Sequence, residues 1–161
     1  MPTLVIAIPF RPDPKCDLDQ MAKDFQQEFA ASSCKKLPEH VCAEIKEIRL
    51  VYQNEGYACA EGDVVIAYGH GGDDNADLSN NQGQWVKPKD VIEMLEGINA
   101  QAAERVLFMA CYSALENHAA PLWKARHGKK TFGGLKDVAT LFQGPLRSGL
   151  FTGVCKALVE V

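Results

Sequence analysis

Residues 64–75 read "VVIAYGHGGDDN", and this stretch decides the fold. Its first five residues are apolar or aromatic without interruption, which is typical of a β-strand buried on both faces. The run ends on His70, which lies between glycines. Residues 105–116, "RVLFMACYSALE", repeat the pattern with Cys111 directly after the apolar run. Two strands of this kind predict the central part of a parallel sheet.

The rest of the chain alternates between strand-like and helix-like segments. Apolar or alternating runs predict strands, whereas apolar residues at helical spacing predict amphipathic helices. Strands are expected at 3–8, 47–52, 63–68, 105–110, 130–135 and 137–142, helices from Asp17, Pro38, Pro88 and Ser113, and a helix or strand over 150–161. This alternation predicts a three-layer α/β sandwich with a mainly parallel central sheet. No linker or internal repeat interrupts the sequence, so a single α/β domain is expected over residues 1–161.

Two of the predicted helices begin with a capping-box pattern. Asp17 and Gln20 form one such pair, and Ser113 and Glu116 form the other. Gly128 is expected to end the second of these helices. Because Cys111 would then lie just before a helix N-terminus, the helix dipole is expected to favour its thiolate form.

The composition argues against several classes of protein. The net charge is −4 and basic residues do not interleave with aromatic ones, so nucleic acid is not an expected partner. No apolar run approaches the roughly 20 residues that cross a bilayer, so no membrane association is expected. The sequence shows no signal peptide, which makes a cytoplasmic location the expectation. The six cysteines include no C-x-x-C pair, so reduced thiols are expected rather than a zinc ribbon or a thioredoxin motif.

His70 and Cys111 are the candidate catalytic residues. In an open parallel sheet, ligands bind beyond the carboxyl ends of the strands, and both residues follow such an end. A crossover between their strands would bring the two side chains to the same edge. A cysteine and a histidine placed in this way form a thiol nucleophile and its base. The backbone amides of Gly71 and Cys111 are expected to bind the oxyanion that forms during acyl transfer.

Three other polar residues lie close to these motifs. Asp73 and Asp74 follow the glycines, where they would orient His70, bind a basic substrate side chain, or simply be solvated. His118 falls on the apolar side of its predicted helix, which favours a buried, hydrogen-bonded histidine over a ligand. No metal site is predicted, because no spacing of His70, Cys111 and His118 fixes a coordination geometry.

The two strand ends also carry a resemblance to a known family. A strand that ends in His-Gly ("YGHGG"), followed by a strand that ends in Ala-Cys ("MACYSA"), resembles the caspase-like (clan CD) cysteine peptidases. The motifs are nearer to the gingipain and CHAT pattern than to caspases, which have "QACRG" at the second position. Metacaspases have an aspartate where this chain has Met109. The specificities of caspases and metacaspases are therefore not carried over.

The resemblance implies a caspase-like fold and an endopeptidase that works through an acyl-enzyme. Cys111 would be the nucleophile, His70 the general base and proton donor, and the amides of Gly71 and Cys111 the oxyanion hole. The expected substrate is a polypeptide, and no metal or organic cofactor is expected. Two alternatives stay open: a catalytically inactive caspase-like module that binds or regulates a partner, and a small-molecule binder that uses residues 69–75 as an anion cradle.

Overall fold

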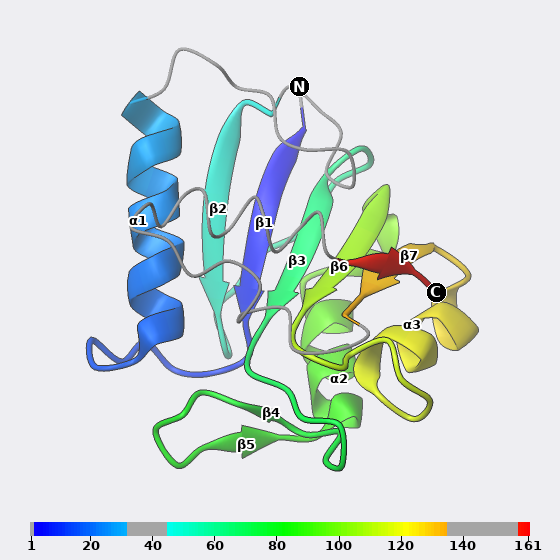
Figure 1. Ribbon diagram of the computed structural model, residues 1–161. Coiled ribbons are helices and arrows are strands. Elements are labelled where there is room, and N and C mark those ends of the chain that lie inside the picture. Colours follow the sequence, from blue (N-terminus) through cyan, green and yellow to red (C-terminus); the bar gives the residue numbers. More distant parts are fainter. Residues whose placement is uncertain (1, 32–44, 135–157) are drawn as a thin grey trace.

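The described residues form one mainly parallel sheet with helices on both faces (Figure 1). The structure is a computed structural model, and it describes residues 2–31, 45–134 and 158–161. The strands are β1 (Thr3–Ile8), β2 (Glu47–Tyr52), β3 (Val64–Tyr68), β4 (Leu78–Ser79), β5 (Trp85–Val86), β6 (Arg105–Met109), β7 (Lys130–Gly133) and β8 (Val159–Glu160). The helices are α1 (Asp17–Ala31), α2 (Pro88–Gly97) and α3 (Ala119–His127), with a short 3-10 turn at Ala100–Ala102.

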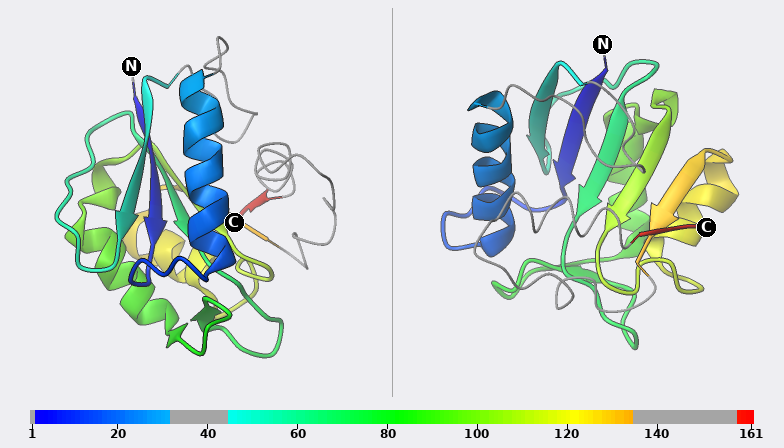
Figure 2. Two further views of the ribbon diagram at one scale, coloured as in Figure 1. Left: turned by 90° about the vertical axis from the view of Figure 1, so that its left-hand side faces the viewer. Right: turned by 45° about the horizontal axis from the view of Figure 1, so that its top comes forward.

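The main sheet has the strand order β2-β1-β3-β6-β7-β8. Every neighbouring pair is parallel except β7 and β8, which run antiparallel. The chain moves toward one edge through α1, and toward the other edge through α2 and α3. Because crossovers between parallel strands are right-handed, opposite directions of travel put the helices on opposite faces. Figure 2 shows α1 on one face of the sheet and α2 with α3 on the other, which confirms the predicted three-layer α/β sandwich.

The central strands are buried along their whole length. All residues of β1, β3 and β6 are buried, as their uninterrupted apolar sequences predict. The edge strand β2 instead contains exposed residues. The α1 helix faces this core with Leu18, Ala22, Phe25 and Phe29, which are all buried. The predicted strand boundaries differ from the observed ones by no more than two residues at β1, β2, β3, β6 and β7.

One local prediction was wrong for a physical reason. The helix expected from Ser113 begins only at Ala119, because the Ser113 hydroxyl is used elsewhere: it lies 2.9 Å from the Phe108 carbonyl oxygen and 2.8 Å from that of Ala110. It also accepts a hydrogen bond from the Gly134 amide at 2.9 Å. A short antiparallel hairpin, in which β4 pairs with β5 across the loop 80–84, adds two strands to those predicted.

Other predictions about the helices had mixed outcomes. The α1 helix begins at Asp17 as predicted, but the Gln20 side chain donates to Asp24 at 2.8 Å rather than completing the capping box. Gly128 ends α3 as predicted, with a left-handed φ of 63° that glycine adopts without strain. The helix expected from Pro38, the strand at 137–142 and most of 150–161 lie outside the described residues. Over the described part of the chain, no helix has the length and apolar content needed to cross a membrane.

Ser113→Ala is expected to lower the free energy of unfolding by about 1–3 kcal/mol, since it leaves the buried Gly134 amide without its acceptor. Urea denaturation followed by circular dichroism measures this change. A midpoint equal to that of the wild type would show that the Ser113 hydroxyl does not hold these strand ends together.

Candidate active site

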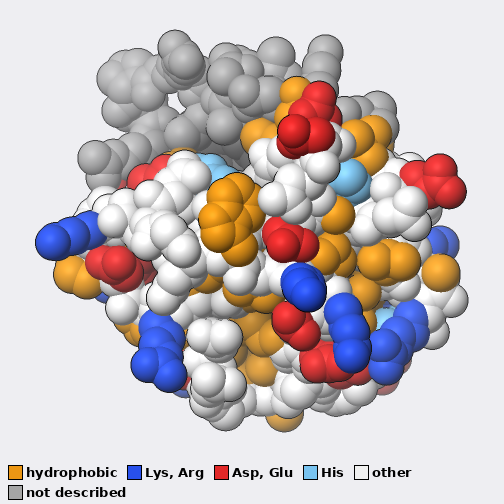
Figure 3. Space-filling view, turned by 90° about the horizontal axis from the view of Figure 1, so that it is seen from below, with side chains coloured by type: hydrophobic (Ala, Val, Ile, Leu, Met, Phe, Trp, Pro, Cys, Tyr) orange, Lys and Arg blue, Asp and Glu red, His pale blue; other side chains and the backbone are white. Residues whose placement is uncertain are grey.

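The register of β3 against β6 brings His70 and Cys111 to the same edge of the sheet. Tyr68 pairs with Met109 at the end of the two strands, and the Gly69 amide donates to the Met109 carbonyl oxygen at 3.4 Å. His70 and Cys111 each follow this last pair by two residues. Figure 3 views the molecule from this edge, where histidine, acidic and hydrophobic side chains reach the surface together. The predicted meeting of the two strand ends is therefore supported by the strand pairing.

The His70 side chain lies on the α1 face of the sheet. The Tyr68 hydroxyl lies 3.4 Å from the Met21 sulfur of α1, so Tyr68 points toward the α1 face. Because side chains alternate along a strand, His70 points the same way, and its contact with Asp17 of α1 agrees with this direction. Met109 is paired with Tyr68 at the end of β6, and Cys111 follows it in a turn.

Gly71 packs directly against the backbone of Cys111. A Cβ atom built on Gly71 would lie 2.1 Å from the Cys111 carbonyl oxygen, far inside van der Waals contact. Only glycine therefore fits at this position without moving the Cys111 peptide. Within the described residues, the Gly71 amide donates no backbone hydrogen bond, which leaves it available for the predicted role in an oxyanion hole.

A carboxylate that the sequence analysis did not assign to the site holds His70. The His70 Nε2 atom lies 3.0 Å from each carboxylate oxygen of Asp17, the first residue of α1. The Asp17 carboxylate also accepts the Leu18 amide at 3.0 Å, which fixes its position at the start of the helix. An acceptor at Nε2 selects the tautomer that carries its proton there, so the lone pair of Nδ1 is left to take a proton. His70 is 28% exposed and Asp17 is 53% exposed, so the pair is open to a substrate.

Asp73 and Asp74 do not fill the His-orienting role. Both are exposed, and neither forms a hydrogen bond with His70. The carboxylate that contacts His70 is that of Asp17, while binding of a basic substrate side chain by Asp73 or Asp74 stays a prediction. The sequence feature that points to Asp17 as a site residue is its position after the carboxyl end of β1, the strand next to β3, although this position does not predict the contact itself.

His118 is a buried, hydrogen-bonded histidine, as the sequence predicts. It is 8% exposed, its Nδ1 atom lies 3.1 Å from the Glu116 carbonyl oxygen and its Nε2 atom 3.0 Å from that of Gly72, and a ring N–H can donate to either. It thereby connects the glycine segment after β3 to the segment that follows Cys111. Over residues 2–31, 45–134 and 158–161, no cluster of three or more His, Cys, Asp or Glu side chains is arranged to hold a metal ion.

Cys111 differs from the other described cysteines in its exposure. Cys16 and Cys59 are buried, whereas Cys111 is partly exposed. Burial raises the pKa of the Cys59 thiol to about 12 and also raises that of Cys16, so both stay protonated at neutral pH. Tyr112, directly after Cys111, has a φ of 60° in the left-handed region, which turns the chain sharply behind the thiol. The expected help from a helix dipole is wrong, because α3 does not begin until Ala119.

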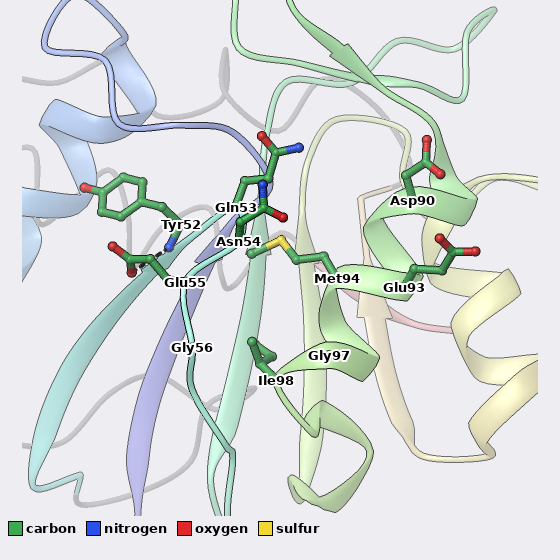
Figure 4. Close-up of a pocket in the computed structure, with 10 residues that line it drawn as sticks. All are labelled: Tyr52, Gln53, Asn54, Glu55, Gly56, Asp90, Glu93, Met94, Gly97 and Ile98. Carbon is green, nitrogen blue, oxygen red and sulfur yellow. Dashed lines mark hydrogen bonds between the residues drawn. The ribbon is translucent and has the colours of Figure 1, made fainter.

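A cavity of about 450 Å³ lies elsewhere, between the loop after β2 and the outer side of α2 (Figure 4). Its lining includes Glu55, Asp90 and Glu93, together with Met94. The Glu55 carboxylate accepts the Tyr52 amide at 3.1 Å, and Glu93 lies 3.7 Å from the Lys89 ammonium. Neither His70 nor Cys111 lines this cavity, so it is separate from the candidate active site.

Comparison with known proteins adds no relative: no family model, no curated protein and no solved structure matches the chain. The geometry of the strand ends is therefore what indicates a function. It combines the partly exposed Cys111, the contact of His70 with a carboxylate, and the packing of Gly71 against the Cys111 backbone.

Gly71→Ala is expected to lower the free energy of unfolding by about 1–3 kcal/mol, since the new methyl group would overlap the Cys111 carbonyl oxygen. Gly72→Ala is the matched control, because a Cβ there meets its nearest atoms, Asp74 Oδ1 and Asn75 O, only at 3.6 and 3.9 Å. That variant should stay within about 0.5 kcal/mol of the wild type. Urea denaturation compares the two, and equal stabilities would contradict the close packing of Gly71 on Cys111.

Proposed function

We propose that the chain is a caspase-like cysteine peptidase that cleaves peptide bonds with Cys111 as nucleophile and His70 as its base. The observation that carries this proposal is the parallel pairing of β3 with β6, continued by the contact of Gly71 with the Cys111 peptide. It supports the resemblance read from "YGHGG" and "MACYSA", because the two motifs follow adjacent strands at the same edge. The Asp17 carboxylate on His70 adds an interaction that a solvated loop histidine would not need.

The reaction would run in two halves, each a transfer of the acyl group. His70 Nδ1 takes the thiol proton while the Cys111 sulfur attacks the scissile carbonyl carbon. The amides of Gly71 and Cys111 would bind the oxyanion of the tetrahedral intermediate. The C–N bond then breaks, and His70 gives its proton to the leaving amine. In the second half, His70 takes a proton from water as the water attacks the thioester, and the thiol leaves with that proton. These steps need no metal or organic cofactor.

The inactive caspase-like module stays the alternative, and covalent labelling separates it from the peptidase. Peptidyl acyloxymethyl ketones with Arg, Lys, Asp, Asn or Leu at P1 are incubated with the wild type, Cys111→Ala and His70→Ala. We expect a single adduct on Cys111 by intact mass and peptide mapping, absent in Cys111→Ala. Loss of His70 should slow labelling about 100-fold or more, because a general base typically contributes a rate factor of at least this size. Labelling spread over several cysteines and indifferent to His70 would exclude the peptidase, and the best P1 residue would identify the specificity.

Asp17→Asn is expected to slow labelling of Cys111 about 100-fold, because an amide no longer fixes the tautomer and orientation of His70. Glu116→Gln is the matched control, since this carboxylate is exposed in the segment after Cys111 and does not contact His70. The second-order rate constant for the best acyloxymethyl ketone is measured for both variants. If Glu116→Gln lost as much activity as Asp17→Asn, the effect would reflect the general negative charge at this edge rather than the bond to His70.

A further inference from the structure

The hairpin of β4 and β5 extends sideways from His70. His70 and Ser79 form an antiparallel bridge in which each amide donates to the other residue's carbonyl oxygen at 2.9 Å. Ser79 is in turn paired with Trp85 on β5. The Gly69 amide points toward β6, and backbone groups alternate in direction along a strand, so the His70–Ser79 bridge lies on the side away from β6. Across this edge the residues therefore follow the order Cys111, His70, Ser79, Trp85.

Trp85 lies on the same side of this ladder as His70. Residues paired across antiparallel strands direct their side chains to the same face. The other pair of the hairpin, Leu78 and Val86, packs on the core: Leu78 is buried, and a Cβ on Gly69 would lie 3.2 Å from it. His70, Ser79 and Trp85 therefore share the opposite face. Successive paired Cα atoms are separated by about 5.5 and about 4.5 Å, so the Trp85 Cα atom is about 10 Å from that of His70. Ser79, between them, is buried, so a substrate would cross above it.

The exposure of Trp85 has no structural explanation in the described residues. Its side chain is 59% exposed, whereas the chain's other tryptophan, Trp123, is 0% exposed in the core. Exposed aromatic residues are enriched where proteins bind partners, because a rigid ring supplies a large contact area. Leu122 is also exposed, at 39%, but it lies on α3 and outside the ladder that leads to His70.

From this geometry, and resting on the proposed peptidase function, we infer that Trp85 forms a substrate subsite for a large apolar side chain on the C-terminal side of the scissile bond. His70 gives its proton to the leaving amine, so the leaving half of the substrate lies over His70. Trp85 is reached by continuing in the same direction, away from Cys111. An extended peptide advances about 3.3 Å per residue, so about 10 Å corresponds to the third residue after the cleaved bond, P3′.

The test uses internally quenched peptides that share one N-terminal half, including the P1 residue that labels Cys111 best. Phe, Leu, Ala or Lys is placed in turn at P2′, P3′ and P4′. For the wild type we expect kcat/KM to be about tenfold higher with Phe than with Ala at P3′. In Trp85→Ala this ratio should fall to within about twofold, and Trp85→Phe should keep most of it. Leu122→Ala is the matched control and should keep the wild-type ratio.

The labelling reagents carry peptide only on the N-terminal side of the cleavage site, and their short carboxylate leaving group does not extend to P3′, so they separate the two proposals. Labelling of Cys111 should proceed at the same rate in the wild type and in Trp85→Ala. If labelling is intact but the Phe preference is absent, or survives in Trp85→Ala, the Trp85 subsite is refuted and the peptidase stands. If wild-type Cys111 is not labelled and no peptide is cleaved, the peptidase itself is refuted, and the subsite with it.

Discussion

The register between β3 and β6 is the constraint on which the candidate site depends. Because side chains alternate along a strand, a slip of one residue would turn His70 away from the α1 face, where Asp17 lies. The register is fixed by five in-register pairs, from Val64 with Arg105 to Tyr68 with Met109. Both strands are buried, so a slip would move the polar residues that flank these strands into the core. At the amino end of these strands, the Glu104 amide donates to the Asp63 carbonyl oxygen at 2.8 Å.

The same register explains why glycine follows His70. The pairing brings the chain after β3 so close to the Cys111 peptide that a methyl group on Gly71 would overlap the Cys111 carbonyl oxygen. The close approach links the conformation of the two segments, and His118 adds a second link through the Gly72 carbonyl oxygen. A histidine and a thiol on separate loops are thus held by backbone contacts rather than by long, flexible side chains.

Much of the fold could be predicted because the strands are short, apolar and continuous. The placement of His70 and Cys111 at the same edge of the sheet followed from parallel topology. The Asp17 contact could not be predicted, since it depends on the path of residues 9–16 after β1, and the sequence pattern assigned Asp17 only a capping role. The Ser113–Glu116 pattern failed for a related reason, because a hydroxyl that bonds to Phe108 and Gly134 cannot cap a helix. The two-residue strands β4 and β5 are too short to give a recognisable alternation.

Among the cysteines that the structure describes, burial distinguishes Cys111 from a second cysteine that lies next to the candidate site. Cys16 precedes Asp17, the residue that holds His70, and its sulfur lies 3.3 Å from the Asn80 carbonyl oxygen. Desolvation raises the pKa of this thiol, and donation to a carbonyl further favours the protonated form. A buried, protonated thiol is a poor nucleophile, whereas Cys111 is partly exposed beside the glycine segment. The fold therefore separates two cysteines near one histidine by solvent exposure: under the proposed mechanism Cys111 would carry the acyl group, while Cys16 packs the loop that positions Asp17.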